Sequence, residues 1–567
     1  MFPRPYIFLR LGLMLALAGL APAVQAQTTY LQQGIEEYQL LDRLETKSGS
    51  LTNEFFTTVK PISRKGAVSF LLEQQADTGS GLSLLDRYNI ERMISVNGEW
   101  TPDGDGAIDS RRPWFKRFYK KQPDFFHLNK ENFFLVVNPV LNFQVLHDRN
   151  TDNSGNRVLN TRGVEVRGRI LNKVGFYTMV TENQEQTPRF VSDWISSHRA
   201  VPGVDFFTVK GKDYDYMQAR GYIDFAAVKD HINVTFGYDR HFIGDGMRSL
   251  LLSDFSAGAT FLRLNTKIWK LNYQNLFLEL TPQFYRGKGG DSRLKQKYAA
   301  IHMLNVNVTR WLNLGFYESV IFGRPDRYEF RYLIPVIFYR SMERGLGSPD
   351  NVNIGFTFKA IAARKLQFYG QFMLDEFTAK ELFGGRGYWA NKFGLQLGGK
   401  YFDVAGIKNL DIQGEMNLVR PYTYSHFDSV ANYTHYNQPL AHPLEANFLE
   451  FLGIIRYQPL KDLFLSFRGM YYQQGTDTAG SNNGANIFMD YRTRSSNYDI
   501  SLIHGVRATC LSGELNASYE LRENLFIDLG AGRRVYSYED DLFPRHVTNY
   551  VYGGLRLNIA RRDYNFY

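Results

Sequence analysis

Residues 524–534, NLFIDLGAGRR, alternate between apolar and polar side chains. Leu525, Ile527 and Leu529 fall on one side of an extended chain, whereas Asp528 and Arg534 fall on the other. The same period of two recurs in the segments 162–170, 230–241, 268–280, 351–360, 462–472, 512–521 and 550–559. This pattern predicts a long series of β-strands, each with one apolar and one polar face.

The composition favours a membrane barrel over a soluble sheet protein, whose strands also alternate. The chain contains 44 Phe and 36 Tyr, yet its mean hydropathy is −0.33. Beyond residue 26, it has no apolar stretch of the length, about 18 residues, that a membrane helix needs. The alternating segments run for about 10 to 14 residues, which suits tilted membrane strands. We therefore predict an all-β transmembrane antiparallel β-barrel of about 18 strands over residues 132–567, in contact with outer-membrane lipid.

The two ends of the chain carry export signals. Arg4 and Arg10 precede an apolar run at 11–20 and a small-residue cleavage pattern at Val24-Gln-Ala26, which together predict a signal peptide over residues 1–26. The chain ends in Asp563-Tyr-Asn-Phe-Tyr567. A terminal aromatic residue after an alternating strand resembles the signal that barrel assembly machinery recognises. The sequence thus predicts export to the outer membrane.

Residues 27–100 have helical rather than strand periodicity. Apolar residues recur every three positions from Ile35 to Leu44, Ser63 can cap a helix over 63–75, and 84–94 is similar. We expect a small N-terminal helical domain that plugs the periplasmic end of the barrel. Residues 101–131 are expected to form a linker, and the aspartates at 103–109 lack the further ligands of a complete calcium loop, so no metal site is predicted.

Catalytic motifs are missing from the sequence. It has no Gly-x-Ser-x-Gly turn, phosphate-binding loop or His-Glu-x-x-His helix, and its single cysteine, Cys510, cannot form an internal disulfide. We predict a protein that is not an enzyme and uses no cofactor; a lipid-cleaving barrel with a Ser/His pair is the weaker alternative. Neither nucleic-acid binding nor a stable oligomer is expected. The formal net charge of +9 is compatible with an anionic partner.

Two polar clusters are the candidate ligand-binding sites. The first lies at the end of the alternating segment 230–241 and in the following turn, and comprises Asp239, Arg240, His241, Asp245 and Arg248. Its charges fit either a shelf for sugar hydroxyls and carboxylates or a salt-bridge lattice that stiffens a wet barrel. Basic residues at predicted lumen positions of many strands, among them Arg220, Arg456 and Arg468, indicate a positive interior.

The second cluster lies in the loop 433–444 and comprises His435, Tyr436, Asn437, Gln438 and His442. Tyrosine faces stack on sugar rings and amides bind hydroxyls, so such a loop suits a carbohydrate. The alternative is a folded loop that constricts the pore.

These two clusters are also where the sequence resembles a known family. Residues 237–254, 261–265 and 435–444, with Trp269 and the opening segment 38–45, resemble the capsule-assembly Wzi family in the longer form that includes the gliding-motility protein RemB. Ala441 stands where that family's pattern leads us to expect glycine. The resemblance implies a plugged barrel of about 18 strands that acts as a lectin for capsular or other surface polysaccharide. An accessory role in gliding and an open diffusion porin are the alternatives.

Overall fold

The computed structural model describes residues 28–77, 81–150, 154–284, 294–324, 327–336, 338–347, 350–477, 480–539 and 543–564. The predicted signal peptide, residues 1–26, and the terminal aromatic residue Tyr567 lie outside these ranges. Within them, no helix is both long and apolar enough to cross a membrane.

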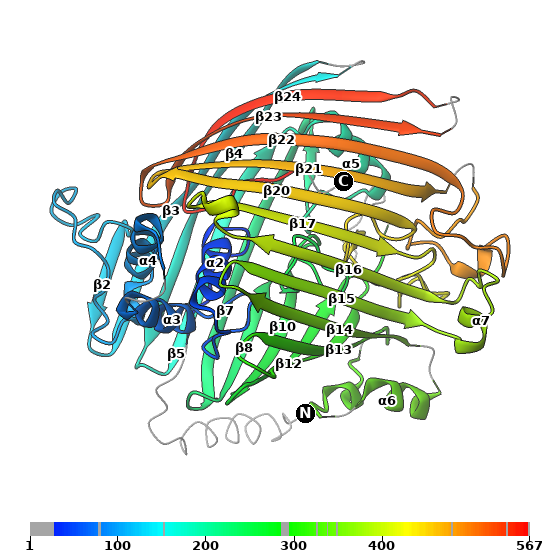
Figure 1. The fold of residues 1–567 in the computed structure, drawn as a ribbon, viewed down its shortest axis with the longest axis horizontal. Coiled ribbons are helices and arrows are strands. Elements are labelled where there is room, and N and C mark those ends of the chain that lie inside the picture. The colour runs from blue at the N-terminus through cyan, green and yellow to red at the C-terminus, as the bar shows by residue number, and fades with distance from the viewer. Residues whose placement is uncertain are drawn as a thin grey trace, which may run out of the picture.

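The chain forms a closed antiparallel barrel of 18 strands, which confirms the predicted fold class (Figure 1). Consecutive barrel strands are hydrogen-bonded neighbours, and the last pairs with the first, with Val551 opposite His147. Closure leaves the sheet without an open edge. The barrel strands are β3 (Phe133–Asn150), β4 (Gly155–Ile170), β5 (Val174–Glu185), β7 (Asp213–Val228), β8 (Ile232–Asp239), β10 (Ala259–Ile268), β11 (Leu271–Leu280), β12 (Lys297–Asn307), β13 (Leu312–Phe322), β14 (Asn351–Ala362), β15 (Leu366–Glu376), β16 (Lys392–Tyr401), β17 (Leu410–Val419), β20 (Phe448–Leu460), β21 (Leu463–Thr476), β22 (Val506–Arg522), β23 (Leu525–Tyr538) and β24 (His546–Leu557).

Two short strands extend this sheet, and four others lie outside it. β2 (Phe126–Lys130) pairs with β3, and β6 (Thr208–Lys210) pairs with β7. Residues 101–131, which were expected to form a linker, therefore contribute the strand β2. β1 (Val59–Lys60) pairs with β9 (Phe242–Ile243), and β18 (Thr434–His435) pairs with β19 (Gln438–Pro439). These last two pairs link segments in the barrel interior.

The strand faces follow the predicted alternation. In β23, Leu529 is 58% exposed on the outer wall, whereas Asp528 and Arg534 are buried inside. Trp269 departs from the prediction because it does not belong to β11. It lies in the tight turn between β10 and β11 with a φ of 54° and points into solvent. The turn therefore breaks the period of two at this position.

The two ends of the barrel differ in the length of their connections. Short turns, such as 229–231 and 363–365, lie at one end, and long connections, such as 186–212, 420–447 and 477–505, lie at the other. Bacterial barrels place short turns in the periplasm and long loops outside, so we refer to a periplasmic end and an outer end. The long connections contain the helices α5 (Arg189–His198), α6 (Tyr339–Leu346) and α7 (Ala379–Phe383).

Three helices occupy the periplasmic end of the lumen: α2 (Glu37–Ser48), α3 (Arg64–Ala76) and α4 (Leu84–Val96) (Figure 1). Ser63 caps α3 by accepting from Gly66 N at 3.1 Å, as predicted, and α4 begins with a reciprocal cap between Ser83 and Asp86. Each helix is too short to be stable alone, so packing must hold it. We refer to α2, α3 and α4 together as the plug helices.

Ion pairs fix the plug helices to the barrel wall. The Arg43 guanidinium of α2 binds Asp86 at 2.7 Å, Asp403 at 2.5 Å and Asp411 of β17. Burial alone would raise the pKa of Asp86, but the charges of Arg43 and Lys47 outweigh this effect and lower the pKa to about 2.

On α4, Arg92 binds Glu520 of β22 at 2.6 Å. These buried charges are paired across the interface, which defines the position of the helices in the barrel.

Candidate functional site

The first predicted cluster is divided between structural contacts and a cavity. Asp245 accepts hydrogen bonds from the Thr57 and Thr58 hydroxyls at 2.5 and 2.7 Å, which joins the loop after β8 to the plug segment. His241 is buried and packs edge-on against Phe261, with ring centroids 4.4 Å apart. Asp245 and His241 therefore make structural contacts inside the barrel, and neither of these contacts is a salt bridge.

The remaining members of this cluster lie nearer to open space. Asp239 lies 3.9 Å from the Arg220 guanidinium, and Arg240 donates to the Asp254 carbonyl at 2.9 Å. Arg248 lies 3.4 Å from Glu450. Of the five predicted residues, only Arg240 and Arg248 line the cavity described below.

The second predicted cluster lies inside the barrel. His435 accepts from Thr281 N at 2.9 Å and faces the Gly258 carbonyl at 2.8 Å, and Asn437 forms two hydrogen bonds with the backbone of Phe284. Gln438 binds Gly203 N and the Val204 carbonyl, both at 2.8 Å. The amide and imidazole groups of this loop therefore bind other loops of the same chain.

The two other members of the second cluster are Tyr436 and His442. His442 Nε2 lies 2.8 Å from Glu450 and is fully buried, whereas Tyr436 is half-buried beside His435. The loop 420–447 also packs on the loop after β8: Tyr424 and Tyr433 donate to the Leu250 and Leu251 carbonyls. This arrangement fits the folded-loop alternative, in which the loop fills the lumen.

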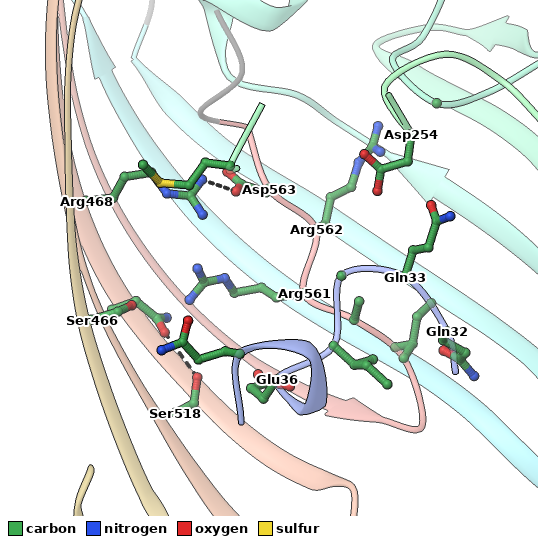
Figure 2. A pocket seen from close by; sticks show the side chains of 18 of the residues that line it. Gln32, Gln33, Glu36, Asp254, Ser466, Arg468, Ser518, Arg561, Arg562 and Asp563 are labelled. Carbon is green, nitrogen blue, oxygen red and sulfur yellow. Dashed lines mark hydrogen bonds and ion pairs between the residues drawn. The ribbon is translucent and has the colours of Figure 1, made fainter. Parts of the chain in front are cut away.

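A cavity of about 560 Å³ remains between the plug helices, the wall and the loops 240–258 and 420–447, which we call the inner loops (Figure 2). The chain beyond β24 enters it, and Figure 2 places Arg561, Arg562 and Asp563 at its wall. Its lining includes the arginines Arg43, Arg220, Arg240, Arg248, Arg456, Arg468, Arg561 and Arg562, and the acids Glu36, Asp254, Asp411 and Asp563. The lining therefore contains more basic than acidic side chains, as the lumen pattern predicted.

Most of this charge is compensated locally. Arg562 binds Glu185 at 2.9 Å, and Arg468 binds Asp563. Arg240 is compensated less completely: burial, together with the nearby charges of Arg220 and Arg562, lowers the pKa of its guanidinium to about 10. The lining as a whole has a surplus of basic side chains, a setting that attracts anions.

The described residues contain no group of three or more metal-ligating side chains. In the segment that resembled part of a calcium loop, Asp105 and Asp109 bind the Lys121 ammonium at 2.7 and 2.9 Å. A lysine thus lies where a cation would have to bind.

Two outer loops form an aromatic cluster that sequence analysis missed. The Tyr388 and Tyr498 rings are tilted by 42° with centroids 5.4 Å apart, and the Trp389 and Tyr491 ring centroids are 4.9 Å apart. Backbone hydrogen bonds join the loops, including Trp389 N to the Asn497 carbonyl at 3.1 Å. We call these four aromatic residues, with the arginines named next, the outer aromatic cluster.

Two guanidinium groups lie over these rings. Arg494 lies 3.8 Å above the Trp389 ring, and Arg386 lies 4.5 Å from the Tyr498 ring and is 57% exposed. Rings and guanidinium groups that share one surface can stack on a sugar ring and bind its carboxylate at the same time. The cluster lies at the outer end, because its loops follow β15 and β21.

Comparison with known proteins supports the fold. No protein-family model matches the sequence, and no curated protein matches it. Among solved structures, the chain is similar to Wzi of Escherichia coli, described as a carbohydrate-binding outer-membrane barrel involved in group 1 capsule assembly. The two share 11% identity and a TM-score of 0.54 over 94% of this chain and all of the other.

Other solved structures match with lower TM-scores and over less of the chain. The match to OprD of Pseudomonas aeruginosa has 11% identity and a TM-score of 0.39 over 74% of this chain and 95% of the other. That to OccAB4 of Acinetobacter baumannii has 9% identity and a TM-score of 0.41 over 75% and 98%. At these identities, the likeness to Wzi shows the outer-membrane barrel fold.

Proposed function

We propose that this protein is a non-enzymatic outer-membrane barrel that retains a surface or capsular polysaccharide through its outer aromatic cluster. The observation that carries this proposal is the convergence of three half-buried tyrosine rings and two guanidinium groups from separate outer loops, with the buried Trp389 ring. The description of Wzi as carbohydrate-binding favours the same ligand class. The packing of the lumen by plug helices and inner loops favours an anchor over a diffusion porin.

The chemistry of the cluster suggests an acidic glycan. Aromatic faces stack on the apolar faces of sugars, and guanidinium groups bind carboxylates with two parallel hydrogen bonds. Tyr388, Tyr491 and Tyr498 are half-buried, so each leaves part of a ring accessible. Exposed contacts of this kind contribute about 0.5–1.5 kcal/mol each, so several must act together.

We expect the double variant R494Q/Y498A to bind the polysaccharide of the producing strain about 10- to 100-fold more weakly, because one cation and one stacking face are lost. Binding of the purified full-length protein to the extracted polysaccharide measures this loss. The control is R111Q/R112Q, which removes two exposed arginines from the segment before the barrel. Equal binding by both variants would contradict the proposed site.

The phenotype of a deletion strain separates the proposed function from its alternative. Release of polysaccharide into the medium supports retention at the surface. Intact surface polysaccharide with lost spreading would instead favour an accessory role in gliding.

A further inference from the structure

The connection between β13 and β14 covers part of the outside of the barrel. Figure 1 shows α6 alongside the barrel wall rather than within the lumen. Tyr332 and Tyr339 are fully buried, and they pack with the outward side chains Val320 and Phe322. We call residues 327–336 and 338–347 the outer-wall segment. Since it is packed on the strands, it is part of the surface that the barrel presents to the membrane.

The outer-wall segment covers a row of polar side chains on the wall. Asn275, His302 and Glu318 are register neighbours on β11, β12 and β13. They point away from the lumen, because Ile301 and Met303 on either side of His302 belong to the interior core. Unpartnered polar groups on this face would be costly in contact with hydrocarbon.

The segment supplies polar partners for two of these side chains, His302 and Glu318. The Tyr339 hydroxyl lies 2.6 Å from His302 Nε2, and Arg340 N donates to Glu318 at 3.2 Å. Farther down the wall, the Tyr273 hydroxyl donates to the Pro335 carbonyl at 2.5 Å. The segment, rather than lipid, thus covers this row of polar side chains, and these hydrogen bonds fix its position on the wall.

The other side of the segment combines exposed apolar and basic side chains. Phe330, Val336 and Phe338 are 76%, 84% and 65% exposed. The exposed arginines of the segment are Arg327, Arg331, Arg340 and Arg344. Its two acids, Glu329 and Glu343, are half-buried, and Glu343 binds Arg340 at 3.0 Å. The exposed side is therefore apolar with an excess of positive charge.

We propose that the outer-wall segment binds a phosphorylated glycolipid of the outer leaflet. Phe330, Val336 and Phe338 would contact its acyl chains, while the arginines bind its phosphate groups. Amphipathic basic segments lie at a membrane interface in this way, and the planar guanidinium group matches the geometry of phosphate. The segment connects two strands at the end with long loops, which places it in the outer leaflet.

The double variant R331Q/R344Q tests this proposal in the full-length protein purified in detergent. With a phosphorylated outer-leaflet glycolipid as the probe, we expect its affinity, measured by native mass spectrometry and titration, to fall about tenfold or more, because each basic side chain near an anionic headgroup contributes about 1 kcal/mol. R507Q/R533Q, which removes exposed arginines of β22 and β23, is the matched control and should bind as the parent protein does. R331K/R344K retains the charge and should lose less affinity than R331Q/R344Q.

Two further arms identify the source of the phosphate. The same glycolipid without phosphate should bind at least about tenfold more weakly than the phosphorylated form, and millimolar inorganic phosphate should not displace the lipid. Displacement by inorganic phosphate would overturn the assignment to a lipid. The heat resistance of the barrel shows that both proteins remain folded. If the parent protein and R331Q/R344Q then bind the phosphorylated glycolipid with equal affinity, the outer-wall segment is not the binding site.

Discussion

Replacing Arg43 with alanine is expected to release the plug helices, at a cost of about 3–5 kcal/mol in the free energy of local opening. The side chain is only 2% exposed and bridges three carboxylates, of Asp86, Asp403 and Asp411. In the variant these carboxylates repel one another, and Lys47, 2.8 Å from Asp86 and 2.6 Å from Asp403, is the one cation of the group that remains. Removing one partner of a buried ion pair leaves uncompensated charge, which is why the effect is large.

Hydrogen exchange measures this release directly. Amides of α2 and α4 should exchange at least about a hundredfold faster in R43A, while those of the barrel strands keep their protection. Arg87→Ala, on the partly exposed side of α4, removes the same type of side chain and should change exchange little. Unchanged protection of α2 in R43A would mean that apolar packing alone holds the plug helices.

Glu450→Ala is expected to destabilise the inner loops by about 2–5 kcal/mol. This β20 carboxylate is fully buried, lies 2.8 Å from His442 Nε2, and accepts from the Asn417 amide at 2.9 Å. Its other carboxylate oxygen lies 3.4 Å from the Arg248 guanidinium. Its removal takes this acceptor from the half-buried Arg248 guanidinium and from the buried side chains of His442 and Asn417.

Thermal unfolding in detergent, followed by near-ultraviolet circular dichroism, tests this effect. The control is Glu182→Ala on β5, which breaks an exposed pair with Arg162 at 3.4 Å. An exposed pair contributes about 0–1 kcal/mol, so the melting temperature of E182A should stay close to that of the parent protein. Similar melting temperatures for E450A and E182A would show that the inner loops do not depend on Glu450.

Local signals in the sequence predicted the strands with regular alternation and the plug helices. The period of two identified β23 and β24, because one face of these strands meets the membrane and the other meets a polar interior. The hydroxyl of Ser63 identified the start of α3. Both signals depend on neighbouring residues, which is why a single sequence reveals them.

The alternation of apolar and polar residues is a weaker signal where the barrel wall does not separate lipid from a polar interior. β12 presents Ile301 and Met303 to an apolar interior core and His302 to the outside, the reverse of the pattern that predicts a membrane strand. The inner loops make the inside apolar, and the outer-wall segment makes a polar outside tolerable. Neither condition can be read from the strand itself.

The role of the polar loop 433–444 depends on partners far along the chain. Its residues suggested a carbohydrate site, since polar loops usually lie at the surface. In the structure, His435 and Gln438 bind backbone groups of Thr281 and Gly203, more than 150 residues away in the sequence. The outer aromatic cluster was missed for the same reason, because Trp389 and Tyr491 lie in separate loops that meet only in the folded chain.

We expect this barrel to span the outer membrane with its lumen filled by the plug helices and inner loops. Single-channel recording of the purified full-length protein in a planar lipid bilayer tests it most directly. The structure predicts a silent membrane or brief, irregular current steps after insertion. Steady, large openings like those of a general porin would contradict a filled lumen and, with it, the anchoring role proposed for the protein.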